Sequence, residues 1–214
     1  MTSILFECHH LYYLPNFLPI IEEFQQRDGY SLSASIPHII NDLERRHLCK
    51  AVETVGIEFI DGDNEATRQA KLRRRKFDVI IVGIPGMLEK VVSDNTVAVM
   101  VYHGIGLKES YYRDTSPRIN IRTVESQERY DELIRRGETN LALTGYTKID
   151  PLASTDSQKN NQFLETLNFS PDRPTLLYAP TFYPSSVEQV LPQLPGLAQE
   201  LNVIIKLHGF SWSQ

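Results

Sequence analysis

A histidine at the end of an apolar run is the feature of this sequence that points most directly to chemistry. Residues 97–101 are apolar, as expected of a buried strand, and His103 follows after one intervening residue, Tyr102. In open α/β sheets, ligands bind beyond the carboxyl ends of the strands. An imidazole accepts a proton near neutral pH, because its ordinary pKa is about 6.5. We therefore predict that His103 is a catalytic base, with a turn-capping role as the alternative.

The residues after His103 are suited to binding an anion. Gly104 leaves its backbone N–H accessible near the start of an expected helix, where amide groups can cradle an anion. Lys108 follows four residues later and could hold a phosphate as a point charge. An ordinary helix-surface lysine is the alternative for Lys108.

A second strand-like run ends in the same way near the end of the sequence. Residues 203–207 contain Lys206, and His208 and Gly209 follow. Two strand-terminal His-Gly pairs with nearby lysines indicate a two-lobed site for an anionic substrate. A surface histidine is the alternative for His208.

Two further histidines follow the first expected strand, residues 3–7. His9 and His10 would reach the same sheet edge as His103, because the carboxyl ends of parallel strands lie together. We predict that His10, or else His9, binds the acceptor. No second Cys/His cluster lies nearby in sequence, so we predict no metal site.

Short apolar runs alternate with amphipathic ones along the first two thirds of the chain, which predicts a parallel sheet with helical crossovers. The expected strands are residues 3–7, 30–36, 57–60, 77–82, 97–101, 118–122 and 140–144. The expected helices are residues 14–27, 39–55, 64–76 and 124–136. The fold class is thus α/β, with a Rossmann-like N-terminal lobe.

A polar stretch separates this lobe from a smaller α/β unit. We predict an N-terminal lobe over residues 1–147, a linker over 148–161 and a partial C-terminal lobe over 162–214. The second unit has two expected strands, 175–179 and 202–207, which is too few for a normal α/β domain, so it looks truncated. Its exposed half-sheet would allow a homodimer or a complementing chain.

The charge and the cysteine content of the chain limit its partners and its compartment. The chain has 214 residues and a net charge of -5, which argues against a nucleic-acid partner. One basic run, residues 71–76, is expected at a solvated helix end, with an anionic lipid or polymer contact as the alternative. The two cysteines show no metal or redox spacing, so a reducing cytoplasm is expected.

Other motifs are absent from the sequence. No signal peptide or span of about 20 apolar residues occurs, so membrane contact would be peripheral, on the inner face of the cell membrane. No Walker or dinucleotide-binding motif and no hydrolase elbow is present, and we predict no cofactor.

Four motifs in order resemble the CDP-glycerol glycerophosphotransferase family, which makes teichoic-acid-like polymers. They are residues 103–108, 145–150, 177–182 and 205–208. The family patterns are approximately His-Gly-Thr-Pro-Leu-Lys, Gly-Tyr-Pro-Arg-Asn-Asp, Leu-Tyr-Ala-Pro-Thr-Trp and Lys-x-His. The resemblance implies a two-lobed GT-B-like fold whose C-terminal lobe binds most of the donor nucleotide.

The reaction implied by the resemblance is transfer of glycerol phosphate from CDP-glycerol to an acceptor hydroxyl of a polymer or glycolipid, with release of CMP. His208 would then contact the donor phosphate or stabilise developing charge as a second catalytic residue. Thr181 would donate to phosphate or ribose, and Lys206 would bind the same donor. Gly145 and Tyr146 would shape the turn between the lobes.

Two other functions stay open at this point. One is a GT-B glycosyltransferase or a nucleotide-sugar 2-epimerase, which would share the scaffold but act on a nucleotide sugar. The other is a non-catalytic binding module. Turnover of CDP-glycerol would indicate the glycerophosphotransferase, and turnover of a UDP-sugar would indicate the nucleotide-sugar enzyme. Binding without turnover would indicate the binding module.

Overall fold

The computed structural model describes residues 1–86, 88–105, 116–154, 157–182, 184–208 and 211. The chain divides into two compact units, Met1–Ala153 and Ser154–Gln214, which we call the N-terminal and C-terminal units and describe separately. The predicted linker, residues 148–161, contains this boundary. Its described backbone is helical, with the 3-10 helix η2 at Thr147–Ser154 and the start of α7 at Ser157–Thr166.

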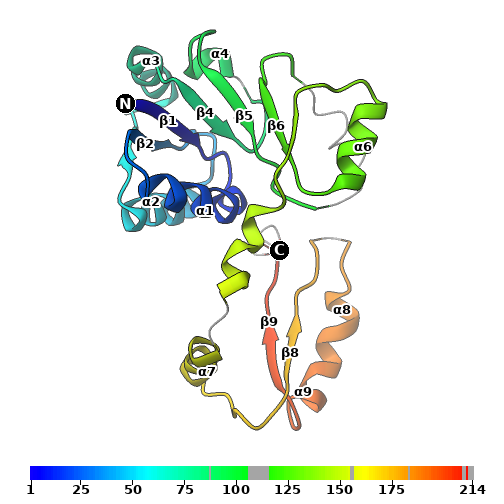
Figure 1. Ribbon diagram of the computed structural model, residues 1–214. Coiled ribbons are helices and arrows are strands. Elements are labelled where there is room, and N and C mark those ends of the chain that lie inside the picture. Colours follow the sequence, from blue (N-terminus) through cyan, green and yellow to red (C-terminus); the bar gives the residue numbers. More distant parts are fainter. Residues whose placement is uncertain (87, 106–115, 155–156, 183, 209–210, 212–214) are drawn as a thin grey trace. The chain divides into compact units, whose positions relative to one another are not determined.

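The N-terminal unit is built on a parallel sheet of seven strands in the order β3-β2-β1-β4-β5-β6-β7 (Figure 1). The strands are β1 (Thr2–Glu7), β2 (Tyr30–Ser35), β3 (Glu58–Phe59), β4 (Val79–Val82), β5 (Val97–Met100), β6 (Ile121–Val124) and β7 (Leu141–Leu143). The helices are η1 (Leu11–Tyr13), α1 (Leu14–Gln25), α2 (Asp42–Val55), α3 (Glu65–Arg75), α4 (Leu88–Val91) and α6 (Gln127–Arg135). The predicted α/β class is confirmed.

Hydrophobic cores lie on both faces of this sheet. Ile4 and Phe6 of β1 pack with α1 and α2 on one face, whereas Leu5 packs with Leu72 of α3 on the other. Successive side chains of a strand point to opposite faces, so β1 contributes to both cores. A strand that is buried on both faces has a continuous run of apolar residues instead of an alternating pattern.

Helix ends follow local capping chemistry. The Oδ1 atom of Asn41 accepts the backbone N–H of Glu44 at 2.9 Å, and Gly56 ends α2 with a φ of 73°. Asn64 caps α3 and Ser126 caps α6 in the same way. These residues set where each helix begins.

Several boundaries differ from the sequence-based expectation. Val124 was expected to open a helix but is the last residue of β6, because the Ser126 cap delays the helix by three residues. Helix α2 begins at Asp42 rather than Ile39, because the Asn41 cap sets its start. Short elements η1 and α4 were missed.

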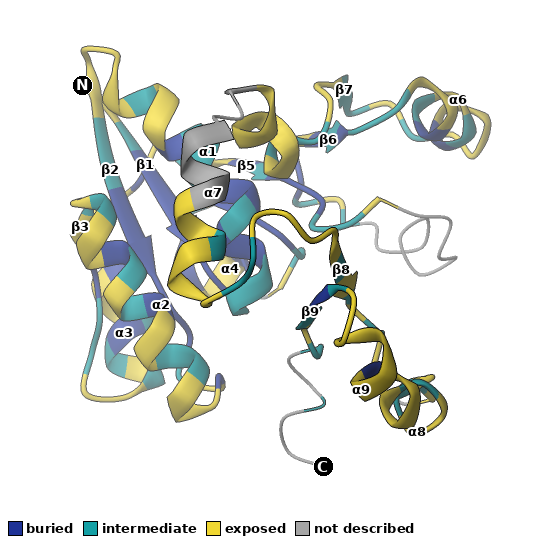
Figure 2. Cartoon of the chain, turned by 90° about the horizontal axis from the view of Figure 1, so that it is seen from below, coloured by how far each residue is buried: buried dark blue, intermediate teal, exposed yellow. Residues whose placement is uncertain are grey.

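The C-terminal unit holds a two-stranded parallel sheet of β8 (Thr175–Tyr178) and β9 (Asn202–Ile205). Its helices are α7, α8 (Val187–Val190), η3 (Leu191–Gln193) and α9 (Leu194–Leu197). Figure 2 shows this unit mostly in the colours of exposed and intermediate residues. Among its described residues only Leu194 and Asn202 are buried.

Within the described residues, no helix combines the length and apolar character that crossing a bilayer would require.

Candidate functional site

The sheet of the N-terminal unit reverses its direction of growth between β1 and β4. The chain runs outward from β1 to β3 on one side, then returns to β4 and continues outward to β7 on the other. In open parallel sheets, the crevice at such a reversal, beyond the carboxyl ends of the strands, is where ligands bind. The segments after β1, β4 and β5 therefore define the candidate site.

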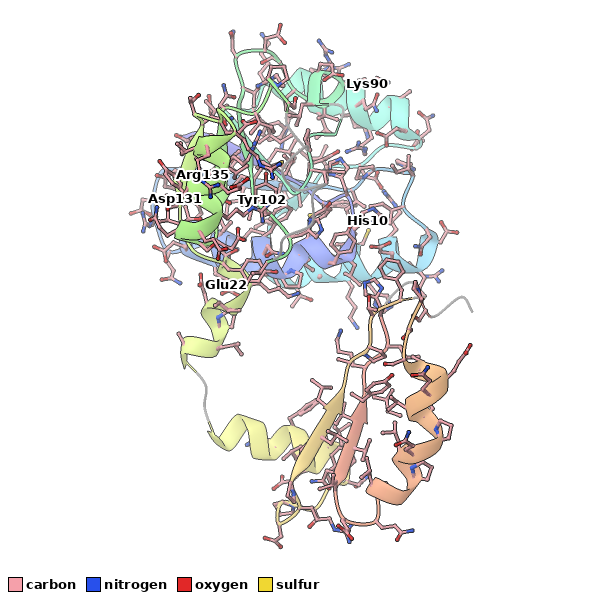
Figure 3. The ribbon with its side chains drawn as sticks, turned by 90° about the vertical axis from the view of Figure 1, so that its right-hand side faces the viewer. His10, Glu22, Lys90, Tyr102, Asp131 and Arg135 are labelled. Carbon is pink, nitrogen blue, oxygen red and sulfur yellow. The ribbon has the colours of Figure 1, made fainter. Side chains whose placement is uncertain are left out.

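Four rings from two of these segments pack together, and we call them the histidine–tyrosine cluster: His10, Tyr12, Tyr13 and His103. The His10 and Tyr12 rings stack with centroids 4.9 Å apart. The His103 ring lies 4.9 Å from Tyr12 and, edge-on, 4.9 Å from Tyr13. The structure thus brings together His10 and His103, which were predicted separately from the sequence. Figure 3 labels His10 in this region.

Glu44 holds the loop that carries His10. Its Oε1 atom accepts the backbone N–H of Leu11 at 2.5 Å and lies 3.5 Å from Nδ1 of His10. Its Oε2 atom accepts the side-chain amide of Asn41 at 3.2 Å. The Glu44 carboxylate therefore lies beside one ring nitrogen of His10 without a hydrogen bond to it. Glu44 was not predicted as a site residue, although its position three residues after the Asn41 cap is typical of a helix start.

A buried ion pair lies behind His9. Arg68 donates from one nitrogen to both carboxylate oxygens of Glu7, at 2.9 and 3.0 Å, and to Oγ of Ser35 at 2.8 Å. Both charged side chains are at most 2% exposed. Burial raises the pKa of Glu7 to about 7, against the attraction of the Arg68 guanidinium. A second carboxylate, Glu65, accepts from the other two Arg68 nitrogens, from Nη2 at 2.6 Å and from Nε at 2.9 Å.

His9 is held in its neutral form by this environment. Burial lowers the pKa of His9 to about 4, and repulsion from Arg68 and His10 adds to the effect. A neutral imidazole at pH 7 can donate a hydrogen bond but is a weak proton acceptor. His9 therefore suits the role of a neutral donor better than that of a base.

Two glycines after β4 allow the segments to approach closely. A Cβ on Gly83 would lie 2.1 Å from Cδ1 of Tyr13, so any side chain there would displace the ring. Gly86 has a φ of 53°, and a Cβ on it would lie 3.0 Å from Nε2 of His9. The loop after β4 thus packs directly against the loop after β1.

The segment after β7 completes this edge of the sheet. The Tyr146 hydroxyl donates to the backbone carbonyl of His103 at 2.8 Å. Gly145 adopts a φ of 82°, a conformation that favours glycine. Thr147 donates to the carbonyl of Asn16 at 2.8 Å and ties η2 to α1. Gly104 directly follows His103, whose carbonyl accepts the Tyr146 bond. Lys108 is outside the residues that the structure describes.

The remaining predicted residues lie together in the C-terminal unit. Thr181 follows β8, and Lys206 and His208 follow β9, so all three are at the carboxyl ends of the paired strands. The backbone N–H of Lys206 donates to the carbonyl of Tyr178 at 2.9 Å. The rings of Phe182 and His208 are 4.9 Å apart.

In the part of the chain described, no three His, Cys, Asp or Glu side chains gather as a metal ion would require. The chemistry that the described groups support is proton transfer by imidazole.

Comparison with solved structures shows what fold this chain has. It is similar to a putative UDP-N-acetylglucosamine 2-epimerase from Listeria monocytogenes, with a TM-score of 0.64 and 12% identity over 97% of this chain and 62% of that one. The UDP co-structure of MnaA from S. aureus gives a TM-score of 0.65 and 12% identity, over 98% of this chain and 63% of that one.

A UDP-N-acetylglucosamine 2-epimerase from Rickettsia bellii gives a TM-score of 0.58 and 13% identity, over 100% of this chain and 64% of that one. The chain therefore spans about three fifths of the length of these proteins. No protein-family model and no curated protein sequence matches it. The likeness confirms the predicted GT-B-like fold. It gives no support to the predicted membership of the CDP-glycerol glycerophosphotransferase family.

Proposed function

We propose that this chain belongs to a GT-B-type enzyme acting on a substrate activated by a nucleoside diphosphate, with a nucleotide sugar as the first candidate. The observation that carries the proposal is the juxtaposition of His10, Glu44 and His103 at the reversal point of the sheet. The GT-B-like fold supports it, and the similar structures include epimerases of UDP-N-acetylglucosamine and a complex with UDP.

His10 is the proposed general base. Its side chain is 36% exposed, so a substrate can reach it, and Glu44 stands beside its Nδ1 atom. As the ring takes a proton from the reacting group, the carboxylate stabilises the positive charge that forms. His103 supplies a second imidazole within the same cluster, and the neutral His9 supplies a hydrogen-bond donor.

The nucleotide would be held mainly by the C-terminal unit. Lys206 offers a positive charge for a phosphate, and Thr181 and His208 offer hydrogen-bonding groups at the same strand ends. Gly104 and Lys108 would contact the activated group from the N-terminal unit. Gly145 and Tyr146 would shape the turn that follows β7.

Transfer of glycerol phosphate from CDP-glycerol is the second candidate function. One specific contact favours it: the Tyr146 hydroxyl bonds the His103 carbonyl, so two of the four motifs that resemble the glycerophosphotransferase family meet in space. In this case His10 or His103 would deprotonate the hydroxyl of a polymer or glycolipid acceptor, and CMP would leave.

The test is to incubate the purified full chain with UDP-N-acetylglucosamine or with CDP-glycerol and to follow both reactions by ³¹P and ¹H NMR. A new sugar epimer, or release of UDP with water as the acceptor, supports the first candidate, and release of CMP with water taking the place of the acceptor hydroxyl supports the second. The His10→Ala variant controls for contaminating enzymes, and His47→Ala, an exposed histidine of α2, is the matched substitution.

Binding of either nucleotide without turnover would contradict an enzymatic role for this chain and would indicate a binding module. Absence of both binding and turnover in a folded chain would contradict the proposal as a whole.

A further inference from the structure

A recess lies along the outer edge of the sheet in the N-terminal unit, and we call it the β3–α3 pocket. Residues 58–61 form one wall, and Lys71, Arg74 and Arg75 of α3 form the other. Its volume is about 320 Å³, enough for a phosphate ester of a small alcohol or sugar. β3 is the edge strand, two positions from β1, so this pocket is separate from the histidine–tyrosine cluster.

The carboxylates of this pocket are already engaged. Asp61 accepts from Arg45 at 2.6 Å and contacts His38 at 3.1 Å. Glu58 pairs with Arg75 and accepts from the Ser33 hydroxyl at 3.1 Å. Negative charge that is neutralised in this way does little to repel an incoming anion.

Lys71 and Arg74 are the cations of this pocket that have no ion-pair partner among the described residues. Within the described residues, neither has a carboxylate within salt-bridge distance or a hydrogen bond from its charged group to the protein. They are three positions apart on α3, so both lie on the same face of the helix. Two neighbouring cations on a chain whose net charge is -5 concentrate positive potential at this pocket.

The wall formed by β3 adds an apolar component. Phe59 is half-buried and Ile60 is 7% exposed, so part of the pocket surface is hydrocarbon. Arg73, also on α3, donates to the carbonyl of Glu89 in α4 at 2.5 Å, and Lys90, labelled in Figure 3, follows Glu89 in the chain. A ligand that combines a phosphate with a short carbon skeleton would match both the cations and the apolar wall.

We propose that the β3–α3 pocket binds the phosphate group of a phosphate ester, through Lys71 and Arg74. This site would bind an anionic molecule apart from the nucleotide, and it does not depend on the function proposed for the histidine–tyrosine cluster. The same chemistry is offered by a soluble glycerol or sugar phosphate and by the headgroup of an anionic lipid. The experiment therefore has one arm for each source.

In the first arm, sn-glycerol 3-phosphate is titrated into the full chain and followed by ¹H–¹⁵N NMR. In the second, the chain is sedimented with vesicles of phosphatidylcholine alone or with phosphatidylglycerol added. The test variant is the double substitution Lys71→Ala and Arg74→Ala. The control is Arg46→Ala with Lys50→Ala, which removes the same charge from exposed positions on α2.

We expect saturable binding in at least one arm, weakened at least tenfold in the test variant and unchanged in the control. Amide shifts should centre on residues 58–61 and 71–75. Equal weakening in both variants would reveal a diffuse charge effect and overturn the proposal. Absence of binding in both arms by the folded wild-type chain would also overturn it.

Discussion

The two units of this chain differ sharply in how much apolar surface they bury. The N-terminal unit covers both faces of its sheet, with Phe6 and Leu5 fully buried on opposite sides of the same strand. In the C-terminal unit, Leu177 of β8 is 57% exposed and Ile205 of β9 is 46% exposed. Both units use parallel strands, so the difference comes from how completely those strands are covered.

Parallel sheets are stable when helices or further strands cover them, and two strands alone are marginal. The N-terminal unit meets this requirement and can hold a histidine loop in a defined position. The C-terminal unit meets it only around Leu194 and Asn202, where the Asn202 amide donates to the carbonyl of Ser170 at 2.7 Å. Most of the folding free energy should therefore come from the N-terminal unit.

The largest expected effect on the free energy of unfolding comes from replacing one leucine by alanine in each unit. Leu72→Ala removes a fully buried side chain and should lower the free energy of unfolding by about 2–5 kcal/mol. Leu177→Ala removes an exposed one and should change it by less than about 0.5 kcal/mol. Urea denaturation followed by circular dichroism measures both, and equal losses would remove the contrast between the units.

Glycine substitutions give a second comparison, of intermediate size. Gly83→Ala places a methyl group against the Tyr13 ring and should cost about 1–3 kcal/mol of stability. Gly196→Ala, in α9, meets no atom within 4 Å and should be neutral or stabilising by up to about 1 kcal/mol. Thermal unfolding of both variants tests this, and a destabilised Gly196→Ala would show that the C-terminal unit is packed more tightly than described.

The smallest effect expected is a pH dependence confined to the N-terminal unit. The pKa of His9 falls from 6.5 to about 4 on folding, so the unfolded chain binds more protons between these values and stability is lost as pH falls from 6.5 toward 4. From pH 7 to pH 5, wild type should lose about 2 kcal/mol relative to His9→Gln. Urea denaturation at the two pH values measures this difference.

Glu7 acts in the opposite direction, since its raised pKa makes stability fall as pH rises from 4.5 toward 7. Both chains in the comparison retain Glu7, so the difference between them reports His9. Parallel pH profiles for wild type and His9→Gln would contradict the burial of His9.

Much of the fold could be predicted because strand runs such as residues 79–82 and caps such as Asn64 are local signals. Val124 was misplaced because an apolar residue between a strand and a helix suits either one, and only the Ser126 cap decides. His10 and His103 could be predicted because each follows an apolar strand. That both rings would pack against Tyr12 could be expected only from the order of the strands.

Other parts of the candidate site could not be read from the sequence, since they depend on contacts between distant residues. Glu44 and Leu11 are 33 positions apart, and the Arg68–Glu7 pair spans 61 positions. The packing of Gly83 against Tyr13 also joins residues that are far apart in the sequence. No local pattern records which helix surface will face a given loop.

We propose that the N-terminal unit carries the chemistry and that the C-terminal unit holds the nucleotide. The most direct test measures turnover of UDP-N-acetylglucosamine and the affinity for UDP in His10→Ala and His208→Ala. We predict that His10→Ala loses turnover at least about 100-fold and keeps UDP affinity within about threefold, whereas His208→Ala weakens UDP binding. A folded His10→Ala chain that turns over the substrate at the wild-type rate would contradict the account.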